Sequence, residues 1–148
     1  MKDGFIKVAA ASPMIKVADA EYNAGKVIEC MKKAAEKGVK LLVFPELTLT
    51  GCSCYDLIGH SVILRGAERA LERVIQASAG SDMLVIVGLP YAPRGGALYS
   101  VAAVESDGEL LGLVPRSETD GTLFAAAADE GGEETVCGKF DAFFDTEL

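Results

Sequence analysis

The chain has 148 residues, half of them hydrophobic and about a quarter charged, which bounds it to one domain or part of one. No run of about 18 apolar residues occurs, so we expect no membrane span, and the first residues show no signal-peptide cleavage pattern. The net charge of −8 argues against a nucleic-acid partner, because such binding needs a basic face.

The first predicted elements are a strand and a helix. Residues 5–11 form an apolar run that indicates a buried strand. Across residues 19–37 the apolar side chains recur every three or four positions, which predicts a helix with one buried face. Asp19 is placed to cap its N-terminus, and Gly38 follows its last turn.

Two more strands and a second helix follow. Residues 39–44 are continuously apolar, which is typical of a strand buried on both faces, and residues 47–55 are rich in loop-forming residues. Helical periodicity then extends from about residue 56 to residue 78. Residues 83–88 predict a third buried strand, which we expect Pro90 to stop.

A β-hairpin is the last element that the sequence pattern predicts clearly. Residues 97–105 and 109–114 flank Asp107-Gly108, a strong signal for a tight turn. The order is therefore β-α-β-α-β-β-β, which predicts an α/β fold with a mixed sheet and helices on one face.

The charge divides the chain near residue 116. Residues 117–148 carry nine acidic residues and one basic residue, so the whole net charge lies in this segment. A solvated acidic surface is the usual interpretation. Phe140, Phe143 and Phe144 predict one more strand near the end. We therefore expect two parts, residues 1–116 and an acidic segment 117–148 that is an incomplete domain.

The four cysteines are expected to be reduced, in a cytoplasmic protein, because no secretory signal accompanies them. Cys30 falls in the first helix and is interpreted as a small buried residue. Cys52, Cys54 and His60 could together bind zinc, but their spacing fits zinc sites poorly and a fourth ligand is missing. We therefore predict no metal site.

Glu46 is the strongest candidate for a catalytic residue. It follows an apolar strand and Pro45, at the carboxyl edge where ligands gather in open α/β sheets. A partly desolvated carboxylate at that place can act as a general base. The alternative from the spacing alone is a Glu that caps a loop amide.

Several motifs resemble the nitrilase superfamily of carbon–nitrogen hydrolases. The central one is Val43-Phe44-Pro45-Glu46-Leu47, with Thr50-Gly51 soon after. Others resemble one branch, the glutamine-hydrolysing domain of glutamine-dependent NAD synthetases: Val8-Ala9-Ala10-Ala11-Ser12-Pro13, Asp19-Ala20-Glu21-Tyr22-Asn23, Ala34-Ala35-Glu36-Lys37-Gly38-Val39-Lys40, Val87-Gly88-Leu89-Pro90 and Gly112-Leu113-Val114-Pro115. The resemblance covers residues 5–116 almost continuously and returns weakly near residues 136–138.

The resemblance implies part of an αββα sandwich and a Glu–Lys–Cys triad that hydrolyses glutamine and supplies ammonia. Glu46 matches the family's general base. Arg116 stands at the position of the family's lysine, and arginine keeps the charge but not the shape or reach. Glutamine would be the substrate, and ATP and Mg²⁺ would belong to a synthetase domain outside this chain.

The resemblance supplies no nucleophile within the chain. The family's cysteine lies in a later Gly-x-x-x-Cys-Glu-Asp-like segment, which would come after Leu148. We therefore expect this chain to be a truncated part of the domain and to be inactive alone. Cys137 lacks those neighbours and is assigned a structural role. A carboxylate beside Cys52 or Cys54 would raise the pKa of either thiol rather than lower it.

Two other interpretations stay open. A degenerate nitrilase-like chain could serve as a non-catalytic subunit or interaction module, assembled into a homo-oligomer through exposed apolar surface. A different hydrolase could use Glu46 with Arg116 gripping a substrate carboxylate; no nucleophile or metal ligand accompanies that pair.

Overall fold

The computed structural model describes residues 4–93, 96–118, 123–126, 135–136 and 142–143. The elements run β1 (Val8–Ala10), α1 (Ala20–Glu36), β2 (Leu41–Val43), the 3-10 helix η1 (Cys52–Gly59), α2 (Ser61–Ala77), β3 (Leu84–Tyr91), β4 (Tyr99–Ser106), β5 (Glu109–Pro115), β6 (Thr135–Val136) and β7 (Ala142–Phe143). The strand expected near the end of the chain corresponds to β7, which includes Phe143; Phe140 and Phe144 lie outside the described residues.

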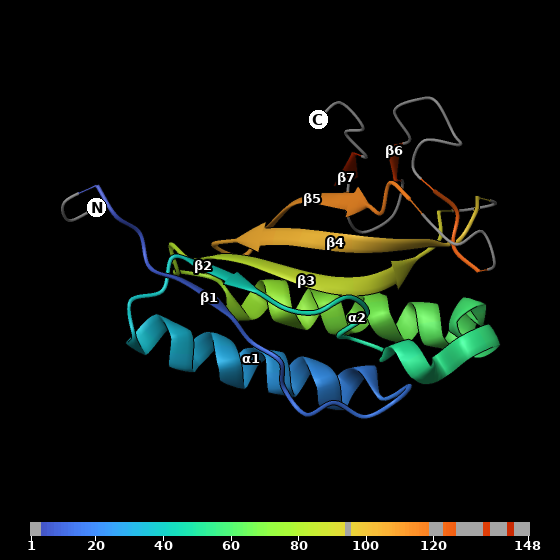
Figure 1. The fold of residues 1–148 in the computed structure, drawn as a ribbon, viewed down its shortest axis with the longest axis horizontal. Coiled ribbons are helices and arrows are strands. Elements are labelled where there is room, and N and C mark those ends of the chain that lie inside the picture. The colour runs from blue at the N-terminus through green and yellow to red at the C-terminus, as the bar shows by residue number, and fades with distance from the viewer. Residues whose placement is uncertain (1–3, 94–95, 119–122, 127–134, 137–141, 144–148) are drawn as a thin grey trace.

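Five strands form one mixed sheet in the order β1-β2-β3-β4-β5. β1, β2 and β3 are parallel, and β3, β4 and β5 are antiparallel neighbours. Both α1 and α2 lie on the same side of this sheet (Figure 1). The predicted α/β class, with a mixed sheet and helices on one face, is confirmed. No helix in the described part of the chain is long and apolar enough to cross a membrane.

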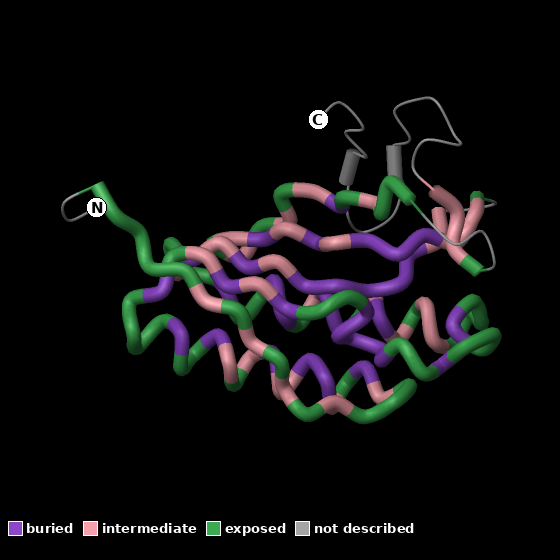
Figure 2. The backbone as a smooth tube through the Cα atoms, in the orientation of Figure 1, coloured by how far each residue is buried: buried purple, intermediate pink, exposed green. Residues whose placement is uncertain are grey.

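The hydrophobic core lies between the sheet and the two helices (Figure 2). α1 contributes a stripe spaced by three or four residues, and α2 contributes a matching stripe, as the sequence predicts. Fully buried apolar side chains in this core include Leu42, Leu71, Val74, Val85 and Val87. The opposite face of the sheet carries no helix among the described residues.

Local sequence signals place α1 and the hairpin correctly. The Asp19 carboxylate caps α1 by accepting a hydrogen bond from Tyr22 N at 3.0 Å. Gly38 follows the last turn with a φ of 70°. Asp107 and Gly108 both have positive φ, as a tight two-residue hairpin turn requires.

Two expectations about buried strands are wrong. β1 is an edge strand whose side chains are largely exposed, with Val8 at 59%. Its apolar run indicates a strand but does not reveal that only β2 pairs with it. β2 has only Leu42 buried, and its other two residues are half-buried. The sheet face that carries these side chains is open.

The end of β3 also differs from the expectation. Pro90 lies inside β3 and pairs with Ser100 rather than stopping the strand. Gly88 O accepts a hydrogen bond from Leu49 N, so the backbone polar groups of Gly88 point away from β4. Residues two apart in a strand point to the same side, so the nitrogen of Pro90, which carries no hydrogen, also points away from β4. β2 has already ended on that side, so the sheet loses no ladder bond there.

The second helix begins later than predicted. Residues 52–59 form η1, and His60 has an extended backbone with a ψ of 136°, so α2 starts only at Ser61. The region predicted as loop, residues 47–55, therefore contains a turn and the first half of η1.

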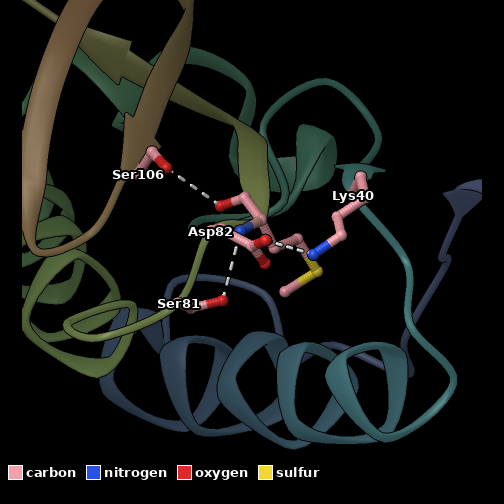
Figure 3. Close-up of polar contacts among 5 residues, drawn as sticks. Lys40, Ser81, Asp82 and Ser106 are labelled. Atoms are coloured by element: carbon pink, nitrogen blue, oxygen red, sulfur yellow. Dashed lines mark hydrogen bonds and ion pairs between the residues drawn. The ribbon is translucent and has the colours of Figure 1, made fainter. Parts of the chain in front are cut away.

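At the edge where β2 and β3 begin, polar contacts tie the strands together (Figure 3). Lys40 forms an ion pair with Asp82 just before these strands. Ser106 Oγ, at the end of β4, donates to Met83 O at 3.3 Å, and Met83 N donates to Ser81 Oγ at 3.2 Å.

Glu105 is an ionisable side chain enclosed in the core. β4 places it on the helix-covered face, paired with Val85 and Leu110 in the neighbouring strands, and it is 0% exposed. Neither carboxyl oxygen has a hydrogen-bond partner among the described residues. Burial raises the pKa of this carboxyl to about 7.

We predict that Glu105 makes the fold less stable as the pH rises. The pKa of this carboxyl is higher in the folded state than in the unfolded chain. Its contribution to folding is therefore fully present when the pH is below the unfolded-state pKa of about 4.5, and it is lost as the pH rises to about 7. The loss amounts to about 3 kcal/mol. Urea unfolding at pH 5 and pH 8 should therefore show Glu105→Gln to be the more stable protein at pH 8, with a weaker pH dependence than the native chain.

Glu109→Gln is the matched control, because it removes an exposed carboxylate from the same hairpin. It should leave the pH dependence of unfolding as it is in the native chain. Identical pH dependence in Glu105→Gln and the native chain would contradict the account of Glu105.

Candidate active site

Glu46 lies in a tight turn that follows β2. Phe44 N still bonds to Ile86 O at 2.9 Å, but Pro45 then ends the pairing. Leu47 takes a positive φ of 53°, and Thr48 Oγ1 donates back to Pro45 O at 2.5 Å. Leu49 N bonds to Gly88 O at 3.2 Å, which returns the chain to the sheet.

The turn is pressed against the backbone of β3 at Gly88. A Cβ atom on Gly88 would lie 2.6 Å from Leu47 N, 2.6 Å from Pro45 O and 2.8 Å from Glu46 Cα. These are rigid backbone atoms, so only glycine allows this approach. Gly88 therefore sets the height of Glu46 above the sheet, which gives the Val87-Gly88-Leu89-Pro90 motif a physical reason.

Two donors hold one oxygen of the Glu46 carboxylate. Ser100 Oγ, from β4, donates to Glu46 Oε1 at 2.6 Å. Arg116 Nη1, just beyond β5, contacts the same oxygen at 3.2 Å. The structure thus brings the two predicted site residues together, although they are 70 positions apart in the sequence.

The two contacts differ in strength. The side chains of Arg116 and Glu46 are 42% and 50% exposed, and such an exposed ion pair contributes only about 0–1 kcal/mol. Ser100 is 3% exposed, and a hydrogen bond to a charged group contributes about 1.5–3 kcal/mol. Ser100 is therefore the stronger restraint on the carboxylate.

These side chains lie beside a cleft of about 410 Å³. Its polar lining includes Glu46, Ser100 and Arg116, and its apolar lining includes Val43, Ile86 and Val114 from the open face of the sheet. The carboxyl ends of β2 and β5 and the start of β4 meet at this edge, as expected for ligand sites in open α/β sheets. The arrangement can accept a proton at the carboxylate and place a fixed positive charge beside it.

The cysteines and the histidine do not join this group. Cys30 is half-buried against the core. Cys54 is buried, with Sγ donating to Thr50 O at 3.3 Å, and Cys52 and His60 are exposed. Among the described residues, no three His, Cys, Asp or Glu side chains are grouped to hold a metal ion. Cys137 lies outside the described residues.

Sequence reasoning missed Ser100 and Gly88 as site residues. Ser100 sits within an ordinary strand pattern, and no local signal marks its hydroxyl as a partner of Glu46. Gly88 had a detectable signal, since a glycine within an apolar strand marks either a bulge or a close backbone approach.

The comparisons with known proteins agree on one family. The carbon-nitrogen hydrolase family model matches residues 7–137. The glutamine-dependent NAD(+) synthetase of Mycobacterium bovis is 35% identical over 114 residues, which are 77% of this chain and 17% of that protein. The synthetase of Aquifex aeolicus is 35% identical over 97 residues, which are 66% of this chain and again 17% of the relative.

Solved structures show the same fold. A glutamine-dependent NAD(+) synthetase from Cytophaga hutchinsonii has a TM-score of 0.81 at 20% identity, covering 94% of this chain and 24% of that one. An amidase from Nesterenkonia sp. has a TM-score of 0.66 at 16% identity, covering 90% of this chain and 52% of that one. The chain therefore spans about a sixth of the length of these curated relatives and half of the amidase.

We predict that Gly88→Ala displaces the turn that carries Glu46. The new methyl group collides with backbone atoms, and such overpacking costs about 1–3 kcal/mol. Urea unfolding should show this loss, and the amide NMR signals of residues 46–49 should move. Gly112→Ala is the control, because its Cβ would meet nothing within 4 Å, and it should be neutral or slightly stabilising. Equal stability and unmoved signals in Gly88→Ala would refute the close approach.

Proposed function

We propose, from the premise that this chain belongs to the carbon–nitrogen hydrolase family, that its Glu46 cleft forms one part of a glutamine-hydrolysing site. The family membership rests on the match over residues 7–137. The choice of glutamine rests on the curated relatives, which are named glutamine-dependent NAD(+) synthetases. The proposed role of the site is to release ammonia for amidation elsewhere in such an enzyme.

The observation that carries the proposal is the geometry of Glu46. Its carboxylate stands at the carboxyl edge of the sheet beside a cleft, and both donors contact the same oxygen, Oε1. Among the described residues, Oε2 has no donor, so it is free to accept a proton. A general base that activates a thiol needs such an oxygen, one that can accept the proton of the thiol.

In the proposed reaction, Glu46 takes the proton of a cysteine thiol, and the thiolate attacks the side-chain amide carbon of glutamine. Glu46 then gives this proton to the amide nitrogen, the C–N bond breaks, ammonia leaves, and a thioester remains. Water hydrolyses the thioester to glutamate and regenerates the thiol. Arg116 provides a positive charge near the oxyanion, in place of the lysine that the family uses.

The nucleophilic thiol is proposed to come from outside this chain. Cys54 is buried and hydrogen-bonded to Thr50 O, and Cys52 belongs to η1, a different segment from the Glu46 cleft. The 148 residues would then hydrolyse no glutamine by themselves. ATP and Mg²⁺ would act in a synthetase domain rather than at this cleft.

A non-catalytic interaction module is the second candidate, favoured by the open face of the sheet. Val8 and Val114 are exposed there, and Val43, Ile86 and Val104 are half-buried. Apolar surface of this kind favours association with another protein or another copy of the chain. In this alternative, the Glu46–Ser100–Arg116 contacts would only stabilise the sheet edge.

We predict that the isolated chain releases no ammonia from glutamine above the level of its Glu46→Gln variant. A chimaera of the M. bovis synthetase that carries the matched 114-residue segment of this chain should release ammonia. Glu46→Gln in the chimaera should lower that rate by about 10²-fold or more, since it removes the general base. Arg116→Lys should raise it.

An ammonia assay with purified proteins distinguishes the outcomes. Glu46-dependent turnover by the isolated chain would show that it needs no outside nucleophile. A folded chimaera whose turnover is insensitive to Glu46→Gln would overturn the role of the base. An inactive but folded chimaera, together with a stable dimer of the isolated chain in light scattering, would favour the interaction module.

A further inference from the structure

We propose that Ser100 is a positioning residue that fixes Glu46 so that Oε2, and not Oε1, is the oxygen presented to the cleft for proton transfer. The base role itself rests on the proposed function. The hydrogen-bond arrangement that selects one oxygen stands on the structure alone.

Ser100 is well placed to hold the carboxylate still. It is 3% exposed, and its hydroxyl donates to Glu46 Oε1 at 2.6 Å. Its carbonyl oxygen accepts a bond from Arg116 N at 2.9 Å, so the same residue anchors both neighbours of the site. Because the Ser100 side chain is short and its strand is paired on both sides, its hydroxyl holds the Glu46 carboxylate in one place.

The two oxygens of the Glu46 carboxylate accept different numbers of hydrogen bonds. Oε1 accepts from both Ser100 Oγ and Arg116 Nη1, whereas Oε2 has no donor among the described residues. An oxygen that already accepts two hydrogen bonds is a poorer proton acceptor than its free twin. The asymmetry therefore assigns the two oxygens different tasks, one for orientation and one for chemistry.

Arg116 cannot impose this orientation alone. Its guanidinium is 42% exposed and also reaches Glu118 O through Nε, on a long and flexible side chain. If Ser100 is removed, the half-exposed carboxylate can rotate and present either oxygen to Arg116. Loss of orientation lowers the rate of a positioned proton transfer even when the base is still present.

The test uses the 148-residue chain with ¹³C-labelled glutamate and NMR at neutral pH. In the native chain, the two Glu46 γ-methylene protons should have separate signals, because one rotamer dominates. Ser100→Ala should merge these signals and move the Glu46 Cδ resonance toward those of exposed glutamates. Ser100→Thr, which keeps the hydroxyl, should restore both features. Glu46→Gln identifies the resonances.

Ser106→Ala is the matched control. Ser106 donates to Met83 O at 3.3 Å (Figure 3). It is the last residue of β4, at the opposite end of the strand from Ser100. It should leave the Glu46 signals unchanged. Amide spectra confirm that each variant is folded, so a general loss of structure is separated from a loss restricted to Glu46.

Unchanged Glu46 signals in folded Ser100→Ala, or failure of folded Ser100→Thr to restore them, would overturn the positioning role. That result is independent of glutamine. The proposed function fails separately, if the chimaera assay shows no dependence on Glu46 while the NMR behaviour of Ser100→Ala is as expected. If both the NMR test and the chimaera assay give the expected results, Ser100 is the residue that orients the general base Glu46.

Discussion

The close approach of one turn to Gly88 is the constraint on which the candidate site depends. Backbone atoms of residues 45–47 occupy the space that a Cβ on Gly88 would need. The turn then returns to the sheet through the bond from Leu49 N to Gly88 O. Glu46 is therefore fixed by the backbones of β3 and its own turn before its side chain makes any contact.

The sheet topology brings the remaining site residues to that turn. Ser100 is the second residue of β4 and Arg116 follows β5, and the antiparallel hairpin places both at the edge where β2 ends. Sequence reasoning predicts Glu46, because a carboxylate after a buried strand and a proline has a local signal. It also identifies Arg116 through the family resemblance. It cannot predict that Ser100 joins them, because this contact depends on strand pairing and not on any neighbouring residue.

The same division applies to the fold. The cap at Asp19 and the Asp107-Gly108 turn are set by nearby atoms and follow from the sequence. The exposure of β1 depends on which strands pair with it, and the tolerance of Pro90 within β3 depends on where β2 ends. Neither is encoded in the apolar run itself. Glu105 breaks the apolar pattern of the core, and its elevated pKa of about 7 appears only once its burial is known.

Amide hydrogen exchange at Leu49 tests the central claim most directly. Its N–H bonds to Gly88 O across the approach that positions Glu46, and Leu49 is fully buried. Exchange at neutral pH should be slowed to the level of amides within β3, because both require the same opening of the sheet. Exchange as fast as that of an exposed loop amide would show that the turn is not held against Gly88, and the account of the site would be wrong.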